Sequence, residues 1–121
     1  MKAEAALDLF CGRGIFKFRA RGKFNCTQAV LKAFQLESGI SEETIQTAAL
    51  QGGGRAPEGL CGALHAARVI LGNGPALAEI ENDFLAKAGS KQCREIRGMR
   101  SLSCSACVTL SAYLLEQYNE K

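Results

Sequence analysis

The sequence contains no tryptophan, a single histidine and two prolines among its 121 residues. No apolar run approaches the roughly 20 residues of a transmembrane helix, so a membrane-spanning helix is not expected. The first ten residues carry Glu4 and Asp8 and lack the apolar core of a secretory signal, and we therefore expect a cytoplasmic protein. The net charge is only +3, which gives no indication of a nucleic-acid partner.

The motifs of the common enzyme classes are also missing. There is no P-loop, no glycine fingerprint for dinucleotides, no HExxH pair and no Ser–His–Asp set. Ordinary hydrolases, nucleotide-binding enzymes and metalloproteases therefore have no support. The chain does contain six cysteines. In a reducing compartment, clustered cysteines indicate metal binding or redox chemistry more often than structural disulfides.

The composition, 47% hydrophobic and 22% charged, is that of a globular protein. Helix-forming residues recur at helical spacing, and alternating β-branched residues are scarce. We therefore expect an all-α fold, a single domain over residues 1–121 packed as an irregular bundle of about five to seven helices. The expected helices cover about residues 2–10, 25–36, 42–51, 57–71, 76–87, a short segment after Ser90 that carries Cys93, and 102–118.

Glycine, proline and serine mark the boundaries of these helices. Gly39 and Gly89 are expected to end helices, and Ser41 and Ser90 to cap the following ones. Pro57 suits a first helical position, and Gly52–Gly54 form a turn before it. Cys61 is then expected about one turn inside a helix.

Residues 13–23 form a basic and aromatic insert. Basic residues between aromatic ones can bind single-stranded nucleic acid or a membrane surface. Five charges over eleven residues are a weak electrostatic signal, and we interpret the insert as a solvated loop or hairpin. Its basic and neighbouring aromatic residues are Arg13, Lys17, Arg19, Arg21, Lys23, Phe16, Phe18 and Phe24.

Four cysteines occur in distinctive sequence words. Cys26 lies in Asn-Cys-Thr-Gln-Ala-Val, and Cys61 follows a triple glycine in Gly-Leu-Cys-Gly-Ala. Cys93 begins Cys-Arg-Glu, and Cys104 stands four residues before Val108. In this order they resemble a family of small redox-active proteins named for its C…GCAxxG…C…C cysteine pattern. The resemblance covers about residues 5–116 apart from the insert, and Ala66 stands where the family pattern has glycine.

The resemblance implies a small helical protein with four motif cysteines and a redox role, without a particular substrate. Cys26, Cys61 and Cys93 match the first three motif positions. Cys104 matches the fourth by its spacing to Val108, and Cys107 is the other candidate for that place. Cys11 lies outside the resemblance and is interpreted as a peripheral thiol.

The chemistry of the individual residues also favours a redox role. Helix N-termini and neighbouring cations lower the pKa of a thiol. Cys93, in the first turn of its expected helix and beside Arg94, is therefore the best candidate for an activated thiolate. Cys61 gains less from the helix dipole, and Cys26 could face it across a helix pair. His65, four residues after Cys61, is interpreted as a packing residue rather than a base or a metal ligand.

Three functions remain open, and the sequence does not decide whether the protein is an enzyme. In the first, Cys93 or Cys61 attacks a disulfide, another motif cysteine resolves it and Arg94 stabilises the thiolate, with a redox protein or a small thiol as partner. In the second, an iron–sulfur cluster or another metal is held by cysteines. The third is a helical interaction module with buried, unreactive cysteines, and a homodimer is compatible with all three. The expected metal ligands are Cys26, Cys61, Cys93 and Cys104, with Cys107 added through its CxxC pair with Cys104.

Overall fold

The computed structural model describes residues 2–11, 24–50, 56–72, 74–100 and 102–119. Within these ranges the protein is all-helical, with eight α-helices, of which six have seven or more residues, and no strand. The expected all-α class is thus confirmed. The basic insert and the turn at Gly52–Gly54 lie outside the described residues. The elements are α1 (Lys2–Cys11), α2 (Cys26–Ala33), α3 (Gln35–Ser38), α4 (Glu42–Thr47), η2 (Ala48–Leu50), η3 (Pro57–Gly59), α5 (Gly62–Leu71), α6 (Pro75–Ala88), α7 (Cys93–Met99) and α8 (Cys104–Asn119).

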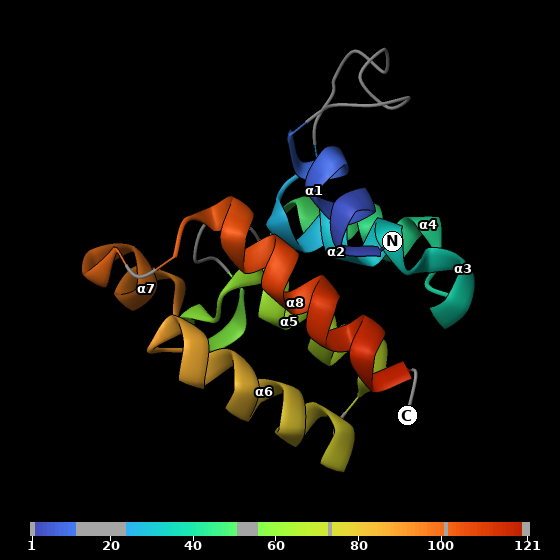
Figure 1. Ribbon diagram of the computed structural model, residues 1–121. Coiled ribbons are helices and arrows are strands. Elements are labelled where there is room, and N and C mark those ends of the chain that lie inside the picture. Colours follow the sequence, from blue (N-terminus) through green and yellow to red (C-terminus); the bar gives the residue numbers. More distant parts are fainter. Residues whose placement is uncertain (1, 12–23, 51–55, 73, 101, 120–121) are drawn as a thin grey trace.

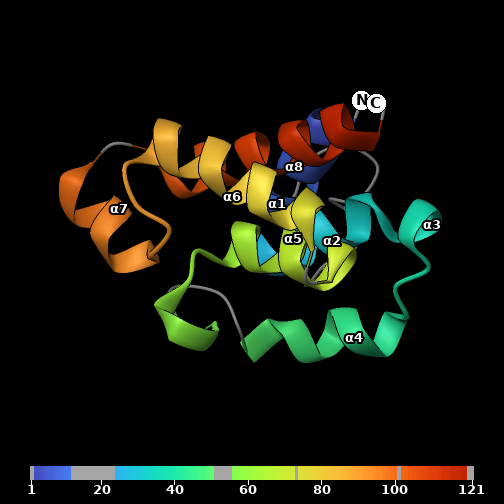
Figure 2. The same ribbon diagram turned by 90° about the horizontal axis from the view of Figure 1, so that it is seen from below.

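The longest helix, α8, forms the centre of the bundle. It packs against α1, α2, α5 and α6, and α2 also packs against α5 (Figure 1). Helix α4 lies on the other side of α2 and α5 from α8 (Figure 2). Helix α7 stands at the end of the bundle where α8 begins (Figure 1). None of the described helices is both long enough and apolar enough to cross a membrane.

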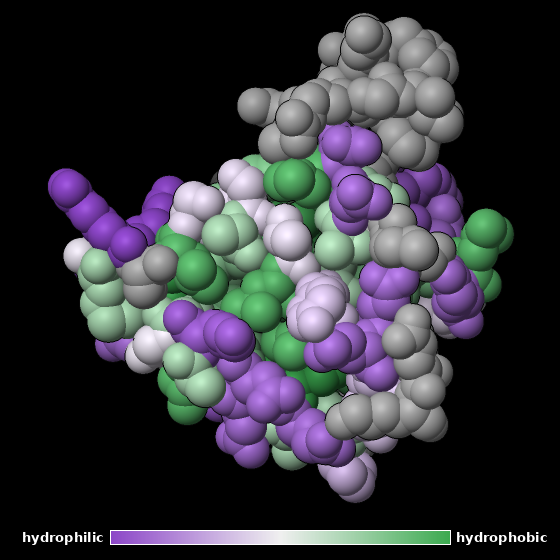
Figure 3. Space-filling view, viewed as in Figure 1, coloured by the Kyte–Doolittle hydropathy of each residue, from purple (hydrophilic) through white to green (hydrophobic). Residues whose placement is uncertain are grey.

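Helical periodicity explains which faces are buried. In α6, Leu77, Ile80, Phe84 and Ala88 are buried at spacings of three and four residues, so they form one stripe along the helix. The outer face of α6 is hydrophilic, whereas hydrophobic side chains fill the seam between α6 and α8 (Figure 3). Both boundaries of α6 lie within one residue of the sequence prediction, and left-handed Gly89 ends it as expected.

Small residues let α5 approach its neighbours closely. Ala63, Ala66 and Ala67 are fully buried on this helix, which packs against α2 and α8. Because an alanine methyl group adds little thickness to a helix, backbones can come close enough for side chains of one helix to bond to carbonyls of the next. This closeness matters for the site described below.

The helix expected over residues 25–36 is divided in two. Phe34, with φ −106° and ψ 11°, separates α2 from α3, and its carbonyl accepts a hydrogen bond of 2.7 Å from the hydroxyl of Ser38. Gly39, at φ 73°, ends α3 as expected. Ser41 caps α4 as expected, because its hydroxyl accepts a 3.1 Å hydrogen bond from the N–H of Thr44.

The expected helix over residues 57–71 begins only at Gly62. Glu58 and Gly59 have φ angles of 66° and 70°, which break the helical path after Pro57. Leu60 then pairs with Gln92 in an antiparallel bridge, and the N–H of Cys61 donates to the carbonyl of Lys91 at 2.8 Å. These backbone bonds replace the ones that a helix would have made. The expectation that Cys61 lies one turn inside a helix was therefore wrong, since it stands directly before α5.

Candidate functional site

Five cysteines line one pocket at the end of the bundle where α2, α5, α7 and α8 begin. The pocket is a shallow hollow with an internal volume of about 20 Å³, and its wall presents almost no nitrogen or oxygen. None of the five cysteines forms a disulfide. The structure thus brings together the four motif cysteines predicted from the sequence and Cys107, the other candidate for the fourth position. The complete lining is Cys26, Cys61, Gly62, Cys93, Ile96, Arg97, Leu102, Cys104 and Cys107.

Each of the four motif cysteines stands at the beginning of a helix. Cys26 and Cys104 are the first residues of α2 and α8, Cys93 is the first residue of α7, and Cys61 directly precedes α5. The N-terminal end of a helix carries a partial positive charge, which favours a thiolate over a thiol. The convergence of these ends makes the pocket a place where negative charge is stabilised.

The sequence motif around Cys26 fixes the start of α2. The side chain of Asn25 accepts a 2.8 Å hydrogen bond from the N–H of Gln28, whose side chain accepts a 3.1 Å bond from the N–H of Asn25. The same two side chains donate to the carbonyls of Ala48, Ala49 and Ile45 at 3.0 to 3.1 Å. The flanking residues of this motif are therefore structural, and they hold Cys26 at the pocket.

Two buried hydroxyls hold the start of α5 between its neighbours. Thr27, which follows Cys26 on α2, donates to the carbonyl of Gly62 at 3.0 Å. Ser111, one turn after Cys107 on α8, donates to the carbonyl of Ala63 at 2.8 Å. Both bonds are completely shielded from solvent. They set the positions of α2 and α8 along α5, and with them the positions of Cys26 and Cys107 relative to Cys61.

The word around Cys93 also has a structural role. The hydroxyl of Ser90 donates to the carboxylate of Glu95 at 2.6 Å and accepts from the N–H of Gln92 at 3.1 Å. Ser90 was expected to be the N-cap of this helix, but Gln92 takes that position and its side chain makes no capping bond. Glu95 therefore stabilises the turn that leads into α7.

Cys61 is the pocket thiol whose pKa is lowered. A hydrogen bond from Cys107 lowers the pKa of Cys61 from 9.0 to about 7, against the opposing effect of burial. The N–H groups of Leu64 and Ala63 in the first turn of α5 add to this lowering, although the sulfur forms no close capping bond. The same contact raises the pKa of Cys107, and burial raises it further. At neutral pH Cys61 is therefore partly ionised, whereas Cys107 keeps its proton.

Cys93 behaves differently from what its helix position suggested. Burial raises the pKa of Cys93, and the charge of Arg97 only partly offsets that effect. Arg97 lies four residues after Cys93 on α7, on the same face, whereas Arg94, the cation expected to act, is exposed and is not part of the pocket lining. Cys93 is therefore a buried thiol with a raised pKa, and these surroundings do not favour the activation that its helix position predicted.

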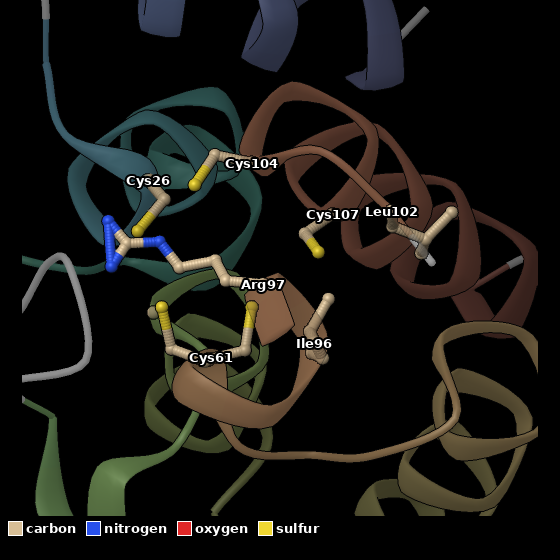
Figure 4. Close-up of a pocket in the computed structure, with 9 residues that line it drawn as sticks. Cys26, Cys61, Ile96, Arg97, Leu102, Cys104 and Cys107 are labelled. Atoms are coloured by element: carbon tan, nitrogen blue, oxygen red, sulfur yellow. The ribbon is translucent and has the colours of Figure 1, made fainter. Parts of the chain in front are cut away.

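Figure 4 shows how the labelled side chains lie. The sulfurs of Cys26, Cys61, Cys104 and Cys107 gather around a common space, and the side chain of Arg97 extends across it with its guanidinium on the side of Cys26. The sequence had named Cys107 only as the other candidate for the fourth motif position and as an added metal ligand, and it had chosen Arg94 rather than Arg97 as the cation of the site. Helical spacing could have indicated both, because Arg97 is one turn from Cys93 and Cys107 is one turn from the buried Ser111.

His65 and Arg68 lie outside this pocket lining. Burial lowers the pKa of His65, with a smaller effect from Arg68, and among the described residues its Nδ1 atom has no hydrogen-bond partner. Arg68 is held by Glu58 at 3.2 Å and by Glu81 at 3.1 Å. This arrangement agrees with the interpretation of His65 as a packing residue.

The pocket cysteines have the chemistry of metal ligands. Thiolates are the preferred ligands of iron–sulfur clusters and common ligands of zinc, so the chemistry of the pocket would suit either. Nevertheless, within the described ranges no three histidine, cysteine, aspartate or glutamate side chains are placed to hold a metal ion together. No ligand set is therefore assigned. The side chain of Cys11 lies outside the described residues.

Comparison with known proteins identifies the family. The family model described as "Putative redox-active protein (C_GCAxxG_C_C)" matches residues 24–118, which include all five pocket cysteines. Searches of curated proteins and of solved structures found no match. The match begins after the basic insert and covers most of the chain, so the resemblance seen in the cysteine words is confirmed. The chain belongs to this C_GCAxxG_C_C family.

Proposed function

We propose that the protein carries out thiol–disulfide exchange, with Cys61 as the attacking thiolate and Cys107 as the resolving thiol. The observation that carries this proposal is that Cys61 and Cys107 line the same pocket as free cysteines, where the interaction with Cys107 lowers the pKa of Cys61 to about 7. A thiol with a pKa near the ambient pH combines a large thiolate fraction with good nucleophilicity. Buried cysteines that only fill space have no need for such a contact.

The proposed reaction has two steps. The Cys61 thiolate attacks one sulfur of a disulfide substrate, the substrate S–S bond breaks, and the leaving sulfur takes up a proton. Cys107 then loses its proton and attacks the Cys61 sulfur, which releases the second half of the substrate as a thiol. Two electrons pass from the cysteine pair to the substrate, and a Cys61–Cys107 disulfide remains. An external dithiol, or two small thiols, would reduce it again and become oxidised.

The contact between the two cysteines also orders these steps. While Cys61 is a thiolate, it holds the proton on Cys107 and raises the pKa of that thiol. Once Cys61 is bonded to the substrate, its negative charge is gone and this cause disappears. Cys107 then ionises more easily, so the resolving thiol becomes reactive only after the first step.

The test is to expose the reduced protein to one equivalent of a small disulfide without oxygen, quench with acid, and map the cysteine peptides by mass spectrometry. We expect a Cys61–Cys107 disulfide in the unmodified protein and a trapped mixed disulfide on Cys61 in Cys107→Ala. Cys104→Ala is the matched control, because it removes a pocket thiol from the same helix and should still yield the Cys61–Cys107 disulfide. A first mixed disulfide on Cys93, or none on Cys61, would contradict the assignment.

The same sample tests the metal alternative. Native mass spectrometry of protein purified without oxygen measures added mass directly. Thiol exchange at Cys61 predicts the mass of the chain alone, followed by a loss of two hydrogens on oxidation that a reductant restores. Added mass equal to iron plus sulfide, or to zinc, that is lost when any one motif cysteine is changed to serine would favour a cysteine-bound cofactor instead.

A further inference from the structure

We propose that the substrate of this pocket is a disulfide with a negatively charged group close to its sulfurs, and that Arg97 binds that group at the mouth of the pocket. This inference rests on the proposed exchange at Cys61 and adds the class of substrate. It starts from the position of Arg97, which lines the pocket from α7 while its side chain remains exposed.

The charge of Arg97 is available to a ligand. Among the described residues no carboxylate forms an ion pair with it. Arg68 is the contrasting case, because two glutamates hold its guanidinium at 3.1 and 3.2 Å. Arginine that serves only structure is commonly paired in this way, whereas an unpaired guanidinium beside a pocket can bind a carboxylate with two parallel hydrogen bonds.

The surroundings of Arg97 strengthen the positive field. Residues 91–100 contain four basic side chains and a single acidic one, Glu95. Glu95 accepts a 2.6 Å hydrogen bond from Ser90, and Lys91 lies 3.7 Å from Glu81. Arg94 and Arg100 are exposed on the same segment. A negatively charged ligand therefore approaches a surface that attracts it, with an effect that salt should weaken.

The pocket wall itself offers little else for recognition. It presents almost no nitrogen or oxygen, so it can accommodate the sulfurs and apolar atoms of a substrate without selecting among them. In such a site the few polar groups at the edge decide orientation and specificity. Arg97 is the polar group that Figure 4 shows extending across the space beside Cys61. A bound anionic group there would also hold the substrate sulfurs near the Cys61 thiolate.

The experiment compares two aromatic disulfides that differ in charge. Dithiobis(nitrobenzoate) has a carboxylate on each ring, and dithiodipyridine is neutral at pH 8. The measured quantity is the initial rate at which Cys61 loses its thiol, followed by acid quench and peptide mass spectrometry. For Arg97→Gln we expect the rate with the anionic disulfide to fall about tenfold, the effect of losing one charge-assisted contact, and the rate with the neutral disulfide to stay within about twofold.

Arg94→Gln is the matched control, because it removes the same charge from the same helix at an exposed position that does not line the pocket. It should change the ratio of the two rates much less than Arg97→Gln does, because Arg94 adds only to the general positive field and does not line the pocket. An equal fall with both disulfides in Arg97→Gln, or the same change of the ratio in Arg94→Gln, would overturn the inference. If Cys61 of the unmodified protein reacts with neither disulfide, the proposed thiol–disulfide exchange itself is refuted. This result differs from those that refute only the role of Arg97.

Discussion

The hydrogen bond between Cys107 and Cys61 is the interaction on which the proposed chemistry depends, and Cys107→Ala removes it. The pKa of Cys61 falls from 9.0 to about 7 in the folded chain, a difference of about two pH units. At about 1.4 kcal/mol per unit, this difference corresponds to a free energy on the order of 3 kcal/mol. The contact with Cys107 is the largest single cause, and a hydrogen bond to a charged group typically contributes about 1.5–3 kcal/mol.

We therefore expect Cys107→Ala to raise the pKa of Cys61 by at least about one pH unit. At pH 7 the thiolate fraction of Cys61 would then fall from about a half to about a tenth, and its alkylation would slow about fivefold. The assay is the pH dependence of the reaction of Cys61 with iodoacetamide, measured by peptide mass spectrometry. The midpoint of that dependence reports the pKa directly.

Two further variants separate this effect from a general disturbance of the pocket. Cys107→Ser keeps a hydroxyl donor at the same place, so its midpoint should stay closer to that of the unmodified protein. Cys104→Ala removes a neighbouring pocket thiol that is not a cause of the lowered pKa, and its midpoint should not move. If Cys107→Ala retains the helical circular dichroism of the unmodified protein and a midpoint near pH 7, then the reasoning about the shared proton is refuted.

Three predictions concern stability, each measured as the free energy of unfolding in urea. Because the pKa of Cys61 is lowered, its ionisation stabilises the fold fully above pH 9, and this contribution is lost as the pH falls through about 7. Because the pKa of Cys107 is raised, that residue lowers the stability above pH 9. The free energy should therefore rise between pH 7 and 9 and fall above 9, and a rise that persists in Cys61→Ala would contradict this origin. Asn25→Ala removes the capping box and two hydrogen bonds to carbonyls of η2, and it should lower the free energy of unfolding by about 1–2 kcal/mol. An unchanged free energy would refute this structural role of Asn25. Ser111→Ala removes a buried bond to Ala63 and should cost about 1 kcal/mol, against no loss for Ser105→Ala on the same helix.

Local patterns sufficed for those parts of the fold that are stabilised locally. The stripe of Leu77, Ile80 and Phe84 and the following Gly89 predicted α6, because burial of one helical face and a left-handed glycine stop are both local features. The helix before Cys61 was predicted incorrectly for the opposite reason. The bridge between Leu60 and Gln92 joins segments more than thirty residues apart, and no local pattern contains it.

Local sequence likewise predicted one part of the candidate site and not another. The order of the cysteine words identified the family and the four motif cysteines, and all four line one pocket. The reactive pair could not be read from the words, because the pKa of a thiol depends on the groups that face it across helices. Burial raises the pKa of both Cys93 and Cys61, but only Cys61 has the interaction with Cys107 that outweighs it.

The sequence by itself determined that this protein is helical, which cysteines belong to its motif, and that a redox family is the right comparison. These properties depend on residue type, periodicity and order along the chain, all of which are local. The tertiary structure alone decided that Cys61 and Cys107 line one pocket and that Arg97, rather than Arg94, lines it with them. The physical reason is that burial, hydrogen bonding and charge act over a few ångströms of space, and only the packing of α5, α7 and α8 brings these side chains within that range.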